Sequence, residues 1–221
     1  MQSVQAAAPS SLGERLVRDA ALLGVALSAA DADRLLLLTA ELARWNERYN
    51  LTAITAPEAM LTHHLLDSLA VQPDLSGSRI ADVGTGAGFP GLPLALVNPG
   101  RQFTLIDSNH KKIRFVSHAV QLLGLSNVAA VHARAETLKP PAPFDTVVTR
   151  AVAALPQMLR SVAPLAGADT RVLAMKGRWP EAELAQVRPP WRVADSRQIT
   201  VPGLDAARCV IVLMRRRSEQ G

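Results

Sequence analysis

Apolar residues in the first third of the chain recur three and four positions apart, which predicts a helix with one buried face. The residues that form this stripe are Leu35, Leu38, Leu42 and Trp45. Residues 28–31 resemble a helix start, because Ser28 is a good capping residue and Asp31 places an acid in the first turn. The sequence Asn50-Leu51-Thr52 is expected to end that helix.

A second helix is expected to start near Pro57, a residue that suits the first turn of a helix. Thr55 and Glu58 stand three residues apart, which is the spacing of a capping box. Apolar positions then continue at helical spacing to about Val71. These patterns predict a helical N-terminal extension over residues 12–75.

From residue 79 the pattern changes to short apolar runs that alternate with helical stretches. The expected strands are residues 80–83, 103–106, 128–131, 144–148 and 172–175. The expected helices are residues 90–97, 108–123, 155–165 and 181–187. Strands that alternate with helices indicate βαβ units, so we predict an α/β fold with a mostly parallel sheet covered by helices on both faces.

The chain end differs, because two apolar runs at 191–201 and 208–214 are joined by a turn too short for a helix. These two runs should pair antiparallel. We therefore expect a seven-stranded, mostly parallel sheet with an antiparallel last strand, in a domain that covers residues 76–215. Residues 1–11 are expected to form a disordered tail and residues 216–221 a basic tail.

Composition restricts the class of protein and its possible partners only moderately. The 221 residues are 48% hydrophobic, enough for one substantial core, and the formal net charge of +5 favours a polyanionic partner. Arginines scattered over a solvated surface would give the same charge. The single cysteine, Cys209, excludes an intramolecular disulfide, and we find neither a signal peptide nor an apolar run long enough to span a bilayer. These features predict a cytoplasmic protein without a membrane segment.

A glycine-rich loop follows the first expected strand and begins with Asp82. Its glycines are Gly84, Gly86 and Gly88. Glycines at this place permit a tight turn and let a ligand approach the backbone closely. Asp107 ends the second expected strand, where an acid accepts hydrogen bonds from ribose hydroxyls. A nucleoside-type cofactor is predicted by this order of elements, in which a strand, a glycine loop, a helix and a second strand are followed by an acid.

The loop spacing favours S-adenosylmethionine over a dinucleotide. Dinucleotide sites use G-x-G-x-x-G to place pyrophosphate at a helix N-terminus, whereas this loop reads G-x-G-x-G with Asp82 before it. A carboxylate there repels pyrophosphate and suits a ligand with sulfonium and ammonium groups. A dinucleotide oxidoreductase, or a turn that binds nothing, remains as an alternative.

The chain contains an ordered set of further motifs. They are Trp45-Asn46, Tyr49-Asn50-Leu51-Thr52, His64-Leu65-Leu66-Asp67-Ser68, Asp82 to Gly91, Arg134-Ala135-Glu136, Phe144-Asp145, Arg150-Ala151 and Met175-Lys176-Gly177. This set resembles the RsmG (GidB) family of bacterial small-subunit ribosomal RNA guanine-N7 methyltransferases. The glycine loop alone is shared by many methyltransferases, but the ordered set is distinctive. The resemblance extends from about residue 12 to 214 and implies a Rossmann-like class I methyltransferase fold.

The resemblance also implies site residues. Gly84 and Phe89 should line the cofactor pocket together with the loop residues and Asp107, and Ala135 and Glu136 should lie near the adenine. Arg150 ends the fourth expected strand and would hold either the cofactor carboxylate or the RNA. Arg134 would stack on the target guanine, hydrogen-bond to it, or grip a phosphate.

The reaction that this family resemblance implies requires few catalytic side chains. Guanine N7 carries an exposed lone pair, so direct in-line displacement needs positioning but no base and no metal. Cys209 in the last strand is expected to pack in the core rather than act as a nucleophile. His63 and His64 point about 100° apart on a helix, which disfavours a shared metal ion. We expect His64 and Asp67 to form a hydrogen-bonded pair that joins the N-terminal helices to the active-site face, near residues 50–52.

The implied substrate is 16S ribosomal RNA, in the small subunit or an assembly intermediate, and the implied enzyme acts as a monomer. A methyltransferase of another RNA or of a small molecule would share the cofactor loop. A non-catalytic RNA-binding module that retains the fold is a further alternative, although the intact loop glycines and Asp107 argue against it.

Overall fold

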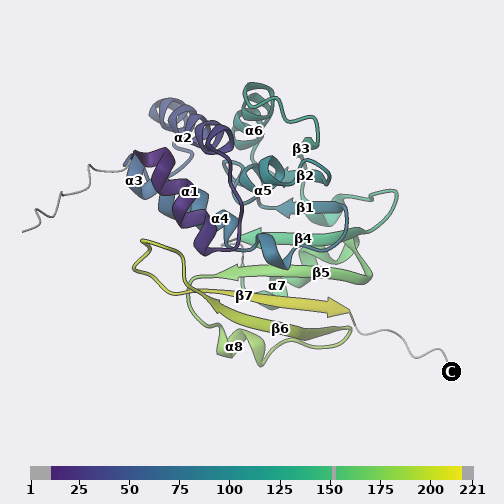
Figure 1. Cartoon of the computed structure of the whole chain (residues 1–221). Coiled ribbons are helices and arrows are strands. Elements are labelled where there is room, and N and C mark those ends of the chain that lie inside the picture. The colour runs from purple at the N-terminus through teal and green to yellow at the C-terminus, as the bar shows by residue number, and fades with distance from the viewer. Residues whose placement is uncertain (1–10, 151–152, 216–221) are drawn as a thin grey trace, which may run out of the picture.

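The computed structural model describes residues 11–150 and 153–215 (Figure 1). Nearly all of the two expected tails, and Ala151 of one sequence motif, lie outside these ranges. No helix within the described ranges is both long enough and apolar enough to cross a membrane.

The N-terminal segment is helical, as the periodicity predicts. Its elements are α1 (Leu12–Leu22), α2 (Ala29–Tyr49), α3 (Pro57–Met60), the π-helical η1 (Leu61–Leu66), α4 (Asp67–Leu69) and the 3-10 helix η2 (Gln72–Asp74). Ser28 caps α2 by accepting a hydrogen bond from the backbone N–H of Asp31. The capping box predicted at Thr55 is wrong, because Ala56 occupies the N-cap of α3 and Pro57 its first position. Thr55 therefore stands one residue too early to cap the helix.

The sheet has seven strands in the order β3-β2-β1-β4-β5-β7-β6. Their bounds are β1 (Arg79–Val83), β2 (Gln102–Asp107), β3 (Val128–His132), β4 (Phe144–Arg150), β5 (Ala166–Lys176), β6 (Trp191–Ile199) and β7 (Arg208–Arg215). The pairs among β1 to β5 are parallel, and β7 is antiparallel to both of its neighbours, which confirms the predicted topology. The strand order reverses between β1 and β4, where open α/β sheets form their ligand crevice.

Helices cover both faces of the sheet. They are α5 (Gly91–Val97), α6 (His110–Leu122), α7 (Leu155–Val162) and α8 (Glu181–Leu184), with 3-10 turns η3 (Ala135–Thr137) and η4 (Ala163–Leu165). Because side chains alternate along a strand, Ile80 packs with the layer that contains α5 and α6, whereas Ala81 packs with α7. This three-layer arrangement is the expected α/β architecture.

The N-terminal helices share a hydrophobic core with the sheet. Leu16, Leu38 and Leu65 belong to the same buried cluster as Ile80 and Val212. Helices α1, α3 and α4 lie beyond the arrowheads of β1, β4 and β5 (Figure 1). The helices therefore border the carboxyl edge of the sheet, where the predicted site residues end their strands.

Candidate active site

The glycine loop after β1 has left-handed backbone at three positions, with φ of 70° at Gly84, 60° at Gly86 and 88° at Gly88. A β-carbon on Gly88 would overlap the side chain of Leu92. Among the described residues, a β-carbon on Gly86 would meet only the Gly84 carbonyl oxygen, at 4.0 Å. Gly88 is therefore required by internal packing, whereas Gly86 borders open space that a ligand can approach.

Two carboxylates hold the loop in place. The N–H of Gly86 donates to Asp107 Oδ2 at 2.9 Å, and the N–H of Asn109 donates to Asp107 Oδ1 at 2.8 Å. Asp82 is fully buried, and its Oδ2 accepts hydrogen bonds from the Thr85 hydroxyl and the Gly91 N–H. Burial raises the pKa of Asp82 to about 6. Asp82 Oδ1 has no hydrogen-bond partner within the described ranges.

A cavity of about 160 Å³, the glycine-loop cavity, opens beside this loop at the ends of β1 and β2. Its lining includes Gly84, Asp107, Arg134, Ala135 and Glu136. The hydroxyl of Ser161 donates to Glu136 Oε1 at 2.8 Å. The backbone N–H of Glu136 and the Ser161 hydroxyl lower the pKa of Glu136, which keeps its carboxylate charged. Five sequence-predicted residues therefore line one cavity.

A second cavity of about 420 Å³, the arginine cavity, lies between the N-terminal helices and the ends of β4, β5 and β7. Asp67 at its wall is only 3% exposed, and its carboxylate accepts from Arg150 Nη1 at 2.9 Å and from Arg208 Nε at 2.8 Å. Arg150 Nη1 also donates to the His63 carbonyl at 3.0 Å. Two guanidinium groups thus share one carboxylate, which leaves this cluster with a positive charge.

An aromatic pair lies beside the Arg150 side chain. The His64 ring stacks on Phe89 with centroids 4.8 Å apart, and the Arg150 guanidinium lies 5.8 Å from the Phe89 centroid. Burial and the nearby Arg150 charge lower the pKa of His64 to about 4, so its imidazole is neutral at pH 7. Phe89 is 3% exposed, and its predicted contact with the cofactor stays a prediction.

The predicted pairing of the His64 and Asp67 side chains is wrong. His64 Nε2 lies 3.0 Å from the Thr52 hydroxyl, and the Asp67 oxygens bind the two arginines instead. The contact between the N-terminal helices and the active-site face nevertheless exists, made by Asp67 through Arg150 and Arg208. Thr52, from the predicted helix break, also belongs to this face through its bond with His64.

The structure separates the two arginines that the sequence could not distinguish. Arg134 lines the glycine-loop cavity, whereas Arg150 lines the arginine cavity. Sequence analysis missed Arg208, which lines the same cavity as Arg150. The signal was available, because an antiparallel last strand brings its first residues to the carboxyl ends of the parallel strands. The register confirms this placement, since Cys209 pairs with Lys176 at the end of β5.

Cys209 is 2% exposed, and burial raises the pKa of its thiol. It packs in the cluster that contains α7. A buried thiol whose pKa is raised agrees with the predicted packing role and is a poor nucleophile.

The polar groups around the glycine loop suit a nucleoside ligand that carries positive charge. Asp107 and Glu136 line the glycine-loop cavity, and one buried oxygen of Asp82 has no hydrogen-bond partner among the residues that the structure describes. The open space at Gly86 leaves the backbone approachable. These features fit the predicted cofactor, S-adenosylmethionine.

Comparison with known proteins identifies close relatives across most of the chain. The model of the family described as rRNA small subunit methyltransferase G (GidB) matches residues 31–212. A ribosomal RNA small subunit methyltransferase G from Shewanella amazonensis is 41% identical over 204 residues, which cover 92% of this chain and 99% of that relative. The corresponding protein of Aeromonas salmonicida is 44% identical over 185 residues, which cover 84% and 89%.

Solved structures share the fold at lower identity. TrmN from Thermus thermophilus matches with a TM-score of 0.54 and 21% identity, covering 70% of this chain and 53% of that protein. Magnesium protoporphyrin IX methyltransferase from Synechocystis, solved with bound SAM, matches with a TM-score of 0.56 and 18% identity, covering 78% and 90%. These likenesses confirm the Rossmann-like class I methyltransferase fold.

Proposed function

Since the chain belongs to the rRNA small subunit methyltransferase G family, we propose that it transfers a methyl group from S-adenosylmethionine to N7 of a guanine in 16S ribosomal RNA. The observation that carries this proposal is the pair of cavities at the carboxyl edge of the sheet. One is lined by carboxylates beside a glycine loop, and the other by arginines. The cavity with carboxylates suits a nucleoside cofactor that carries positive charge, and the cavity with arginines suits an anionic RNA strand.

The glycine-loop cavity is proposed to hold the cofactor. Asp107 accepts hydrogen bonds from the ribose hydroxyls, while Ala135 and Glu136 lie beside the adenine. Gly84 and Gly86 let the ligand approach the backbone, Gly88 lets the loop pack closely against Leu92, and the negative charge of Asp82 favours a cation. When bound, S-adenosylmethionine supplies an electrophilic methyl group attached to a sulfonium. Phe89 completes the proposed set of cofactor contacts, and Arg150 holds either the cofactor carboxylate or the RNA.

The arginine cavity is proposed to receive the target guanine. Asp67 fixes the Arg150 side chain through a hydrogen bond of 2.9 Å, and a fixed guanidinium orients a base or phosphate more effectively than a mobile one. Arg134 approaches from the side of the glycine-loop cavity and grips the RNA backbone or the guanine. The role of these residues is to position the substrate.

No base and no metal ion enter the proposed mechanism. The N7 lone pair would form a bond to the methyl carbon as the bond from that carbon to sulfur breaks, which would leave S-adenosyl-L-homocysteine as the neutral product. The protein therefore has only to align the two reactants and to accommodate the charge that moves from sulfur to the guanine. His64 is neutral at pH 7 and is held by Thr52 and Phe89, which suits a structural role beside the site. The proposed substrate is the RNA within the small subunit or an assembly intermediate in the cytoplasm, and the enzyme acts as a monomer.

Methyl transfer to ribosomal particles tests this function. Purified protein is incubated with methyl-labelled S-adenosylmethionine and small subunits from cells that lack the endogenous activity. We expect label in the RNA of the small subunit and none in large subunits treated in the same way. Cofactor binding without any label in RNA would contradict the proposal and point to a small-molecule substrate or a non-catalytic module.

A further inference from the structure

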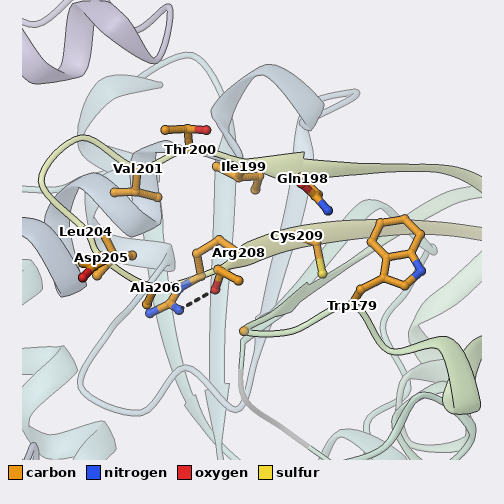
Figure 2. Close-up of a pocket in the computed structure, with 12 residues that line it drawn as sticks. Trp179, Gln198, Ile199, Thr200, Val201, Leu204, Asp205, Ala206, Arg208 and Cys209 are labelled. Carbon is orange, nitrogen blue, oxygen red and sulfur yellow. Dashed lines mark hydrogen bonds between the residues drawn. The ribbon is translucent and has the colours of Figure 1, made fainter.

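A third cavity, of about 480 Å³, borders the arginine cavity and shares Gly177 and Arg208 with it. We call it the Trp179 groove. Figure 2 shows Trp179 at one end of the groove and Leu204 and Asp205 at the other, with Arg208 between them. The groove therefore continues from the proposed guanine site along the surface of the protein.

Trp179 does not serve as a core residue. Its side chain is 44% exposed on the loop after β5, whereas Trp191 is 8% exposed and packs with the cluster around α7. A large exposed indole is uncommon on a surface without a partner, and tryptophan is a good platform for stacking unpaired bases.

The polar residues of the groove complement the edge of a base. Gln198 carries both an amide donor and an acceptor, and Asp205 carries acceptors for amino groups. Both residues are exposed and line the groove. Asp205 would repel a phosphate, so the groove itself suits a base, while Arg208 stands at the boundary with the arginine cavity and is suited to a phosphate.

We propose that the Trp179 groove binds an unpaired base of the ribosomal RNA, a nucleotide neighbouring the guanine that occupies the arginine cavity. This inference rests on the proposed function, because the Trp179 groove meets the proposed guanine site at Gly177 and Arg208 and so offers an RNA strand a path beyond its target guanine. Stacking on Trp179 then fixes the strand on one side of the target, and the amide of Gln198, which lies at the Trp179 end of the groove, contacts the edge of the flanking base.

Substitution of Trp179 tests the groove kinetically. In Trp179→Ala, we expect the KM for small subunits to rise about tenfold, within the range that loss of one stacked base produces. Trp179→Phe retains an aromatic face and should restore most of the loss. Leu37→Ala is the matched control, since Leu37 is also 44% exposed but lies on α2. The control should leave the KM unchanged, and all variants should bind S-adenosylmethionine as the wild type does.

An unchanged KM in Trp179→Ala would overturn the inference while leaving the proposed function intact, provided that the wild type methylates the subunits. Absence of methylation by the wild type would overturn both. A photoreactive benzophenone amino acid in place of Trp179 gives an independent readout. We expect a crosslink to RNA within a few nucleotides of the methylated guanine, and a crosslink only to a ribosomal protein or to distant RNA would overturn the inference.

Discussion

At the scale of single residues, Gly86 and Gly88 have the same left-handed backbone but different surroundings. Gly88 packs against Leu92, whereas Gly86 faces open space beside its hydrogen bond to Asp107. Substitution at Gly88 is therefore a test of folding, and substitution at Gly86 is a test of ligand approach.

In Gly86→Val, we expect affinity for S-adenosylmethionine to fall by roughly a hundredfold, equivalent to about 3 kcal/mol, because two methyl groups enter the ligand space. Left-handed backbone also strains a valine by about 1–2 kcal/mol. Gly24→Val is the control, since Gly24 has φ of 76° and an added β-carbon would have no atom within 4 Å in the part of the chain that the structure describes. Calorimetric titration and thermal unfolding separate these effects, and near-normal affinity in Gly86→Val would mean that the loop does not bind the cofactor.

The lowered pKa of His64 predicts a pH-dependent stability. His64 takes up a proton near pH 6.5 in the unfolded chain but only near pH 4 in the folded protein. The free energy of unfolding is therefore highest above pH 6.5, and it declines as the pH falls towards 4 because protonation of His64 favours the unfolded chain. In His64→Gln this loss disappears. The difference between the unfolding free energies of wild type and variant should therefore shrink by up to about 3 kcal/mol between pH 7 and pH 4. Urea unfolding measures it, and a difference independent of pH would contradict the burial of a neutral imidazole.

At the scale of secondary-structure elements, Asp67 ties α4 to two strands that lie on either side of β5. Its oxygens bind Arg150 at the end of β4 and Arg208 at the start of β7. The two arginine side chains are 21% and 22% exposed, so water screens this cluster only partly. Removal of the shared carboxylate would leave two cations close together with poor solvation.

In Asp67→Asn, we expect the free energy of unfolding to fall by about 3 kcal/mol, because a buried charge cluster loses its anion. Methyl transfer to small subunits should slow by up to about a hundredfold, because the Asp67 carboxylate no longer fixes the Arg150 side chain. Asp31→Asn removes an exposed pair with Arg34 and should cost less than about 1 kcal/mol. Equal stability changes in the two variants would show that the Asp67 carboxylate does not stabilise the cluster with Arg150 and Arg208.

Elements with a strong local pattern were predictable from the sequence. The five apolar runs from 80–83 to 172–175 each fall within an observed strand. The expected continuous helix from Pro57 to Val71 is instead divided by the π-helical turn of η1, because apolar spacing does not encode a shift in the hydrogen-bond pattern. The pairing of Asp67 with Arg208 spans 141 positions and has no local signature. The residues that line the glycine-loop cavity were therefore predictable from the sequence, whereas only Arg150 and Asp67 of the arginine cluster were.

At the scale of the whole molecule, the N-terminal helices and the sheet depend on one core. Leu16, Leu38 and Leu65 are each fully buried in the cluster that contains Ile80 and Val212. Neither part would bury its apolar surface alone, although the sequence changes character near residue 75.

We expect a single thermal unfolding transition, with a van't Hoff enthalpy equal to the calorimetric enthalpy, because the shared core couples the helices to the sheet. A fragment of residues 76–215 should not fold, since the apolar side chains that share a core with α1, α2 and α4 would be exposed to water. Differential scanning calorimetry checks the first outcome and circular dichroism the second. Two separate transitions, or a cooperatively folded fragment, would contradict the coupling.

The central claim is that this fold delivers a methyl group to guanine N7 in small-subunit RNA, and its most direct test is the chemical identity of the product. Small subunits from cells lacking the endogenous activity are treated with the protein and S-adenosylmethionine, and their RNA is digested and analysed by mass spectrometry. We predict an increase in 7-methylguanosine at one nucleotide of 16S RNA. Methylation at another atom or base, or unmodified RNA despite cofactor binding, would contradict the account.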